Sequence, residues 1–296
     1  MALEKPKTHP SISIRELESF DDLLKVGPLE REVWGLESED VLPLTMIIAT
    51  KAAGSLWIGA FDGNELVGFA FGFPGIEHGR LMIHSHMLAV RTQYRDLALG
   101  YKLKLAQREK ALAMKIREMT WTFDPLQSKN AHLNFAKLGV ISQSYRTDFY
   151  GPSTSSVLHQ NSTDRLWVRW PMASRRVQQR LRGEDHRSET LDTLSRLTPL
   201  IRFNGEGKPQ RTDLAAALSR QRIAIEVPSD IGNIEEKDIT LARSWRSETR
   251  WAFTEALKGG FFVAEFSRVV RGNQGPGVYL LEKGDPAEYV PELADA

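Results

Sequence analysis

The stretch Leu88–Gly100, with the sequence LAVRTQYRDLALG, connects a predicted strand to a predicted helix. Leu81–Val90 before the turn is rich in β-forming residues, and Leu97–Met114 has apolar residues at the spacing of an amphipathic helix. A tight turn that leads into a helix exposes unpaired backbone N–H groups, and the helix dipole adds positive potential there. Small residues such as Ala98 and Gly100 let a ligand approach the backbone closely. The pattern therefore predicts a turn that can hold a pyrophosphate.

Strands and helices are predicted on both sides of this turn. Two β-rich runs joined by Asp62-Gly63-Asn64 predict an antiparallel hairpin, and the strand, helix, strand order that follows the hairpin predicts a parallel crossover. The sequence thus predicts a mixed α/β (α+β) fold. In this part of the chain we expect strands at 11–17, 56–61, 65–73, 81–90, 119–123, 140–149 and 164–170, and helices from Ser19, from Pro43, at 97–114 and at 128–138.

The C-terminal part of the chain differs in composition. Pro171 ends the strand 164–170, and residues 171–220 are polar and Arg-rich, which favours a linker or an extended arm. Residues 221–284 again show ordered patterns: strands at 222–227, 261–266 and 278–281, and a helix at about 238–258 with an apolar face. We therefore expect a first domain at 11–170, the linker or arm at 171–220, and a small α+β lobe at 221–284.

Length and composition exclude several classes of protein. The chain has 296 residues, enough for about two domains, and its 41% hydrophobic and 26% charged residues are typical of a soluble globular protein. It has no cysteine, which excludes disulfides, thiolate metal sites and a cysteine nucleophile. No apolar run approaches the roughly 18 residues of a membrane span, and the first residues show no apolar stretch of a signal peptide. We expect a cytoplasmic protein without membrane contact.

The formal net charge of +1 conceals an uneven distribution. Residues 11–45 hold nine acids and three bases, whereas residues 165–222 hold thirteen bases and six acids. The basic segment is either a solvated connection that pairs with the acidic N-terminal helix, or a surface for nucleic acid, an acidic partner or a phosphorylated ligand. Between Trp170 and Arg222 only Phe203 interleaves the bases, and nucleic-acid surfaces usually offer stacking aromatics, so nucleic acid is the less favoured partner.

The turn and the elements around it resemble the GNAT acyltransferase superfamily. Its acyl-CoA loop reads Gln or Arg, two residues, Gly, one residue, then Gly or Ala, and Arg95, Ala98 and Gly100 occupy that pattern after Val90. The resemblance covers residues 11–170 and includes the helix 128–138 with the Gly that follows it. The segments HSHMLAV, WTFDPLQSKNAHLNF, KLG, DFYG and TDRLWVRW are similar to a bacterial GNAT group with a C-terminal extension. The resemblance implies a GNAT-like mixed sheet flanked by helices, with a second, smaller α+β lobe.

The resemblance implies an acyl-CoA site, with acetyl-CoA as the default cosubstrate and no tightly bound cofactor. Asp96 and Ala98 stand where many members have glycine, so a carboxylate and a methyl group lie near the expected phosphates. Basic side chains of Arg95, Lys102 and Lys104 would offset part of that charge. The residues implied to bind the cosubstrate are Leu88, Ala89, Val90, Arg95, Asp96, Leu97, Ala98, Leu99, Gly100, Tyr101 and Asn130.

Two histidines on the strand before the turn are candidate general bases. His84 and His86 share a strand face, and an imidazole is suited to take a proton from an amine near neutral pH. The alternative is that both are hydrogen-bonded strand histidines without a role in proton transfer. They could also supply two metal ligands, but the sequence offers no defined third ligand, so we assign no metal.

Other polar residues near the expected cleft have less defined roles. The tyrosine that often serves as general acid in the superfamily is Phe135 here, so Tyr150 or Tyr145 would have to replace it. Asp124 ends a predicted strand and is either a substrate contact or a turn aspartate.

The resemblance implies an acyl-CoA-dependent N-acyltransferase in which a small-molecule amine attacks the thioester directly. The alternative is a degenerate GNAT lobe that binds acyl-CoA or a partner without turnover. A homodimer is left open by the sequence, as are the acceptor and the acyl group.

Overall fold

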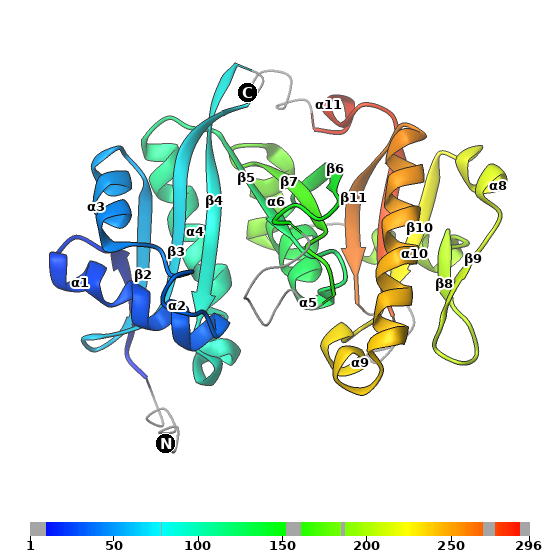
Figure 1. Cartoon of the computed structure of the whole chain (residues 1–296). Helices are drawn as coiled ribbons and strands as arrows, with labels where there is room; N and C mark the ends of the chain where they lie inside the picture. The colour runs from blue at the N-terminus through cyan, green and yellow to red at the C-terminus, as the bar shows by residue number, and fades with distance from the viewer. Residues whose placement is uncertain (1–9, 78, 152–160, 185–186, 269–275, 291–296) are drawn as a thin grey trace. The chain divides into compact units, whose positions relative to one another are not determined.

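A computed structural model describes residues 10–77, 79–151, 161–184, 187–268 and 276–290, and Figure 1 shows the order of the elements. The chain forms two compact units, which are described separately here. The first contains the described residues up to Thr120 and the second contains those from Trp121 onward. Their boundary lies within strand β5 (Glu118–Phe123); the domain limits expected from the sequence, at 170 and 220, stay a prediction.

The first unit is a sheet with helices on both faces. Its strand order is β1-β2-β3-β4-β5, and the neighbours are antiparallel except for β4 and β5, which pair in parallel. This confirms the predicted hairpin and the predicted parallel crossover. The elements are β1 (Ile12–Glu16), α1 (Phe20–Leu24), α2 (Val26–Trp34), α3 (Leu44–Ala52), β2 (Leu56–Asp62), β3 (Glu65–Glu77), β4 (Arg80–Val90), the 3₁₀ turn η1 (Thr92–Leu97) and α4 (Leu99–Ala113).

Strand alternation divides the core of the first unit into two layers. On one face, Trp57 and Phe69 of the sheet pack with apolar residues of α1, α2 and α3. On the other face, Val67 packs with Leu99 and Leu103 of α4. The start of α4, directly after η1, is therefore anchored to the sheet by buried side chains.

The second unit continues from β5 and has the strand order β7-β6-β11-β12-β10. Strand β11 pairs with β6 in antiparallel orientation, so the C-terminal strands extend the sheet of the β6–β7 pair. Figure 1 shows α10 alongside these strands. The elements are α5 (Ser128–Ala131), the π-helix η2 (His132–Leu138), β6 (Ile141–Arg146), β7 (Arg165–Pro171), α6 (Arg175–Arg182), α7 (Arg187–Arg196), β8 (Ile201–Phe203), β9 (Pro209–Arg211), α8 (Leu214–Leu218), β10 (Arg222–Val227), α9 (Ile231–Lys237), α10 (Ile239–Lys258), β11 (Phe261–Ser267), β12 (Gly277–Lys283) and α11 (Pro286–Tyr289).

Residues 171–220 differ from the expected linker or arm, because they contain α6, α7, the β8–β9 hairpin and α8. Most residues of α6 are polar, so no apolar face in the sequence indicated a helix there. In the structure, Val177 of this helix is buried. The basic residues also pair differently from the expectation. Arg176 and Arg180 bind Glu265, whereas Asp22 of the acidic N-terminal helix binds Arg15 of its own unit.

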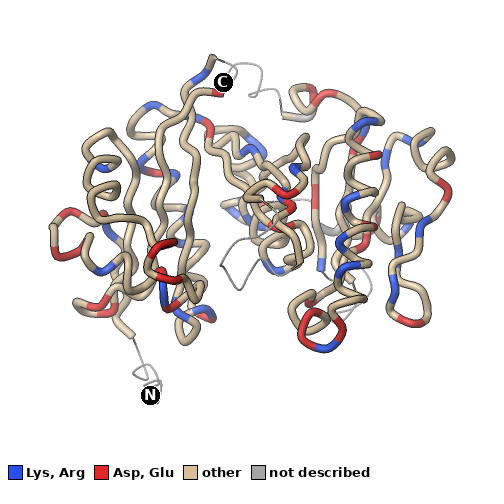
Figure 2. The backbone as a smooth tube through the Cα atoms, viewed as in Figure 1, with Lys and Arg blue, Asp and Glu red and all other residues tan. Residues whose placement is uncertain are grey.

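In the described part of the chain, no helix is long and apolar enough to cross a bilayer. Basic residues recur along α10, in the second unit (Figure 2). The arginines of this helix that face the unit interior take part in ion pairs, as shown below.

We predict that the C-terminal region is needed for the second unit to fold. Tyr145 stacks on Phe253 at a centroid distance of 5.6 Å, and Phe135 lies 5.8 Å from Tyr279, so a fragment ending at Trp170 loses both contacts. Each aromatic side chain that becomes exposed costs roughly 1.5–3 kcal/mol. The fragment 1–170 should aggregate, or unfold at a much lower temperature than the whole chain, in sedimentation and calorimetry. A monomeric fragment with the full-length transition temperature would contradict this prediction.

Candidate functional site

The turn between β4 and α4 is tied to the sheet at both ends. The backbone N–H of Arg91 donates to the carbonyl of Val67 at 2.9 Å, which continues the strand pairing past the end of β4. Tyr94 in η1 is buried, and its hydroxyl donates to an Asp62 carboxylate oxygen at 2.9 Å. The chain then passes through Ala98 into α4. The position of the helix start is therefore set by contacts of the turn itself.

Ala98 adopts the left-handed conformation, with φ 54° and ψ 29°. This conformation is unfavourable for a residue with a Cβ and costs about 1 kcal/mol or more. Ala98 is also the N-cap of α4, and its methyl group cannot accept a hydrogen bond from the first helical turn. The backbone N–H groups of Leu99, Gly100 and Tyr101 belong to that turn, where an α-helix offers no acceptor of its own.

Gly100 is not required by the packing of the protein. A Cβ at this position would meet only the Leu88 side chain, at 3.6 Å, an ordinary contact distance. Its φ is not in the left-handed region, so any residue could adopt the backbone conformation. Glycine therefore leaves the first turn of α4 uncovered, as the close approach of a ligand to the backbone requires.

The remaining turn residues divide between surface and core. Arg95 and Asp96 are exposed, so water screens the charge of Asp96 and reduces its repulsion of an anion. Leu97 and Leu99 pack in the core beside the sheet. Leu88, Ala89 and Val90 pair with β3 through their main chain, at Ala70, Phe69 and Gly68.

Strand β4 contains a bulge at His86. Phe71 of β3 is paired with Met87 and Gly72 with Ser85, so His86 is the extra residue between the two pairs. The bulge is a local irregularity of the strand, and such features often lie at functional sites. β4 pairs with β5 at Ile83 and His84, and the segment from Ser85 to Val90 lies beyond this pairing.

His84 is buried on the face of β4 opposite to α4. Its Nδ1 lies 3.0 Å from Thr120 Oγ1, and the Thr120 hydroxyl donates to the Met82 sulfur. Nδ1 is thus engaged with the Thr120 hydroxyl, whichever of the two atoms donates. Burial, followed by the charges of the neighbouring His86 and Lys104, lowers the pKa of His84 to about 4. The imidazole is therefore neutral at pH 7.

His86 is the exposed member of the pair. The two imidazole centroids are 6.2 Å apart, and both rings contact Phe73, at 5.5 Å for His84 and 6.0 Å for His86. The neighbouring groups partly desolvate the imidazole of His86, and this desolvation lowers its pKa. The structure thus brings the two predicted bases together and leaves His86 as the one that solvent reaches. Among the described residues, no group of three or more His, Cys, Asp or Glu could hold a metal ion.

The sequence prediction for Lys104 was wrong, because this side chain does not lie near the expected phosphates. It is buried between α4 and the sheet, with Nζ donating to Ser85 Oγ at 2.7 Å, and Ser85 donates to Gln107 Oε1 at 2.8 Å. Burial lowers the pKa of Lys104 well below its usual value. The spacing of Lys104 and Gln107 on the inner face of α4 was the signal in the sequence for this polar cluster.

The other predicted site residues belong to the second unit. Asn130 in α5 is exposed. Tyr150 is 38% exposed, and its hydroxyl lies 3.2 Å from Thr122 Oγ1. Tyr145 is instead held by Asp164, to which it donates at 2.6 Å, and burial raises its pKa well above the usual value. Tyr150 is therefore the more accessible of the two tyrosines.

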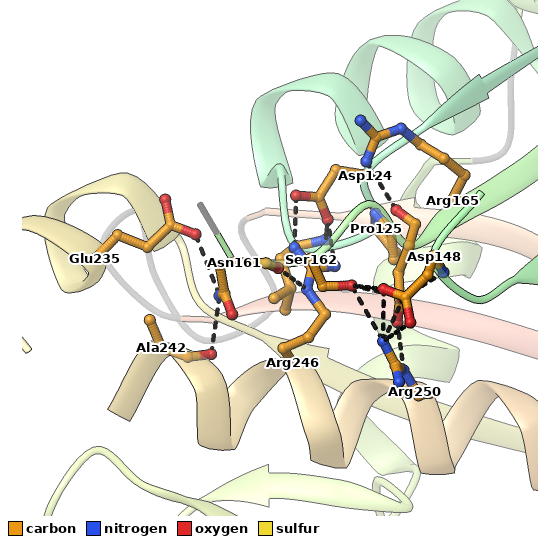
Figure 3. A network of polar contacts seen from close by, with 12 residues as sticks. Asp124, Pro125, Asp148, Asn161, Ser162, Arg165, Glu235, Ala242, Arg246 and Arg250 are labelled. Atoms are coloured by element: carbon orange, nitrogen blue, oxygen red, sulfur yellow. Dashed lines mark hydrogen bonds and ion pairs between the residues drawn. The ribbon is translucent and has the colours of Figure 1, made fainter. Parts of the chain in front are cut away.

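Phe135 and Asp124 have structural environments within the second unit. Phe135 is fully buried. Asp124 binds Arg246 of α10 through both carboxylate oxygens, each at 2.7 Å, and accepts the backbone N–H of Leu126 at 2.9 Å (Figure 3). The turn interpretation of Asp124 is confirmed, and its ion pair with Arg246 was not visible in the sequence because the two residues are far apart along the chain.

Comparisons with known proteins found solved structures that are similar to part of this chain. No protein-family model matches the sequence, and no curated protein matches it significantly. The solved structures that are similar include the ribosomal-protein-S18-alanine N-acetyltransferase from Escherichia coli, with 15% identity, 54% of this chain and 94% of that chain covered, and a TM-score of 0.44. An acetyltransferase of the GNAT family from Streptococcus pneumoniae has 17% identity, 54% and 98% coverage, and a TM-score of 0.43. Aminoglycoside 6'-acetyltransferase type Ii has 18% identity, 55% and 99% coverage, and a TM-score of 0.44. The likeness concerns the fold of about 55% of the chain and leaves an extra region.

We predict that Ala98→Gly stabilises the protein. Glycine adopts the left-handed conformation without the steric cost of a Cβ, so the free energy of unfolding should rise by about 0.5–1 kcal/mol. Ala106→Gly, in the interior of the same helix, is the matched control and should lower it by about 1 kcal/mol. Urea unfolding of both variants measures the difference. An Ala98→Gly protein no more stable than the original would show that the left-handed turn is not strained.

We predict that His84 makes stability depend on pH. Its pKa is about 4 in the folded protein and about 6.5 when exposed, so the unfolded chain takes up the proton first as the pH falls. The contribution of neutral His84 to the free energy of unfolding is complete above about pH 6.5. As the pH falls toward 4, up to about 3 kcal/mol of it is lost. Burial raises the pKa of Glu30 to about 7, so the contribution of Glu30 to stability changes with pH in the opposite direction. The measurement is therefore the difference in unfolding free energy between the original protein and His84→Gln from pH 4 to 7; a constant difference would contradict the prediction.

Proposed function

We propose that this chain is an acyl-CoA-dependent N-acyltransferase, with acetyl-CoA as the default donor and a small-molecule amine as acceptor. The observation that carries the proposal is the uncovered first turn of α4, which follows left-handed Ala98 and is kept free of a side chain by Gly100. Three features of this turn favour a pyrophosphate: its backbone N–H groups, the positive end of a 15-residue helix, and the exposed Arg95.

The proposed binding of the cosubstrate follows from these positions. The pyrophosphate takes the N–H groups of Leu99, Gly100 and Tyr101, and the pantetheine part contacts the main chain of Leu88–Val90. The resemblance implied Asn130 as a further contact, and this residue is exposed on α5 of the second unit. Asp96 is exposed and is expected to turn away from the phosphates.

The proposed chemistry uses the exposed histidine. The neutral amine attacks the thioester carbonyl carbon, the C–N bond forms, and the C–S bond breaks. His86 takes the proton that the amine loses, and the departing CoA thiolate takes a proton from solvent. His84 is a weaker base, because its pKa is about 4 and Nδ1 is engaged with Thr120. Its proposed role is to hold the strand face on which His86 lies.

A second candidate function is binding of acyl-CoA without turnover. Phe135, which stands where the superfamily often has a proton-donating tyrosine, is fully buried, and the imidazole of His84 is weakly basic. Both observations reduce the acid and base groups available for transfer. Under this alternative the protein binds acyl-CoA but releases no thiol with any amine.

Calorimetric titration with acetyl-CoA tests the proposed binding site. Gly100→Ala introduces a methyl group that meets only Leu88 at 3.6 Å, and alanine favours a helix by about 1 kcal/mol over glycine. The variant should therefore be as stable as the original or more stable, yet bind acetyl-CoA more weakly. Gly100→Glu adds bulk and negative charge and should abolish measurable binding. Unchanged affinity in folded Gly100→Glu would remove this turn from the site.

Thiol release separates the two candidate functions. The full chain is incubated with acetyl-CoA and a panel of primary amines while free thiol is monitored. Transfer predicts release that His86→Gln lowers by roughly 10²-fold to 10⁴-fold, with CoA affinity retained. Retained affinity without release for every amine would favour the binding function, and wild-type rates in both His84→Gln and His86→Gln would exclude histidine from the mechanism.

A further inference from the structure

Two phenylalanines of β3 lie beside the two histidines of β4, all within the first unit. Phe71 and Phe73 are two residues apart and share one side of the sheet, and His84 is the cross-strand partner of Phe73. The ring centroids of Phe73 and Phe71 are 5.7 Å apart, and the imidazole of His86 meets the edge of Phe71 at 6.2 Å. These four rings are called the aromatic face below. The pairing of β3 and β4 fixes their arrangement.

Methionine side chains border the aromatic face along the strands. A Cβ on Gly75 would meet the methyl carbon of Met82 at 2.9 Å, so the Met82 side chain lies across this glycine, on the same side of the sheet. Met87 is the cross-strand partner of Phe71 and, like Phe73, packs against the core of this unit. Methionine is flexible and polarizable, which suits it to apolar ligands of varied shape. The two imidazoles therefore have apolar surroundings in both directions along the strands.

The aromatic face opens to solvent at the proposed base. Phe71 is buried, Phe73 is half-buried, and His86 is exposed. An amine that contacts the imidazole of His86 brings the rest of its molecule close to Phe73, because the two ring centroids are only 6.0 Å apart. The main chain of Leu88–Val90, which is proposed to contact pantetheine, begins two residues after His86 on the same strand. The thioester and this face are thus served by one strand.

The electrostatic surroundings of the two histidines are neutral to positive. A nearby carboxylate would raise the pKa of an imidazole. Instead, burial and the charges of His86 and Lys104 lower the pKa of His84, and desolvation lowers that of His86. In the described part of the chain, no acidic side chain joins the two histidines in a group of three or more that could hold a metal ion. A second ammonium group on an acceptor would lose hydration at this face without gaining an opposite charge from it.

We infer that the aromatic face is the acceptor site, and that the acceptor is a primary amine on an aromatic or other apolar group, without a second charge. This inference rests on the proposed function, in which His86 takes the proton of the amine. Phe73 is then a specificity-determining residue, because it contacts the imidazole of His86 and is the half-buried phenylalanine of the face. The site and the turn before α4 both belong to the first unit.

Thiol release from acetyl-CoA with matched amines tests the class of acceptor. Pentylamine and 1,5-diaminopentane have the same carbon chain and differ by one ammonium group, and phenethylamine carries an aromatic ring. For the full chain, kcat/KM should be higher for pentylamine and for phenethylamine than for 1,5-diaminopentane by about 10-fold or more, because the second charge would lose hydration. An equal or higher kcat/KM for 1,5-diaminopentane would overturn the inference and leave acyl transfer intact.

Substitutions at Phe73 test whether this face sets the preference. Phe73→Asp places a carboxylate beside His86 and should reverse the preference toward 1,5-diaminopentane. Phe73→Leu keeps an apolar side chain, so it should keep the preference for pentylamine but lower kcat/KM for phenethylamine about 3- to 10-fold relative to pentylamine. Phe20→Asp is the matched control, because Phe20 is a 57% exposed phenylalanine of α1 in the same unit, and it should retain the original ratios.

Thermal unfolding shows which of these variants are folded. Unchanged ratios in folded Phe73→Asp would overturn the assignment of the face. Where Phe73→Asp does not fold, an unchanged ratio of phenethylamine to pentylamine in Phe73→Leu would do the same.

Binding of the amine is measured separately from transfer by the imidazole proton NMR signals of His84 and His86, assigned with His84→Gln and His86→Gln. Phenethylamine should shift these signals at concentrations at which 1,5-diaminopentane does not. Shifts without thiol release would overturn the proposed transfer and retain the apolar amine site. Neither shifts nor thiol release would overturn both.

Discussion

The left-handed conformation of Ala98 is the constraint on which the first unit's candidate site depends. Ala98 lies between the 3₁₀ turn η1 and α4, and its left-handed conformation separates the two elements. Buried Tyr94 before it and buried Leu99 after it hold the change in place. The helix consequently begins without a polar cap, and its first N–H groups remain available to a ligand. A backbone strain of about 1 kcal/mol thus accompanies a potential anion site.

Position along one strand gives two neighbouring histidines different chemistry. His84 lies in the regular part of β4, is buried, and binds Thr120, whereas His86 is the extra residue of the bulge and is exposed. The same residue type therefore has a pKa of about 4 at one position and solvent contact at the other. Phe73 contacts both rings, so the two imidazoles share one apolar neighbour. A base suited to proton transfer needs access as well as geometry, and His86 is the exposed histidine of the pair.

Several buried charges among the described residues of the second unit are paired with an opposite charge. Asp124 and Arg246 form a two-oxygen pair, and Glu265 lies between two arginines of α6. Removing one member of such a pair leaves a charge without solvation, which is strongly destabilising. Along the sequence these partners are distant, so the pairs join the C-terminal elements to the β5–β6 connection. The Arg-rich composition of this region reflects internal pairing as well as surface charge.

The sequence by itself determined the kinds of elements and their order. Period-two alternation marked the strand at 11–17, where β1 lies, and glycine and small residues marked the turn before α4, because these signals are local to a few residues. Only the tertiary structure decided the partners of the arginines, the burial of Lys104 and the support of η2 from α6. Those features depend on contacts between residues far apart in the chain, such as Arg180 and Glu265, and no local pattern records which distant charges meet. The bulge at His86 belongs to the same class, since it exists only relative to the register of the neighbouring strand.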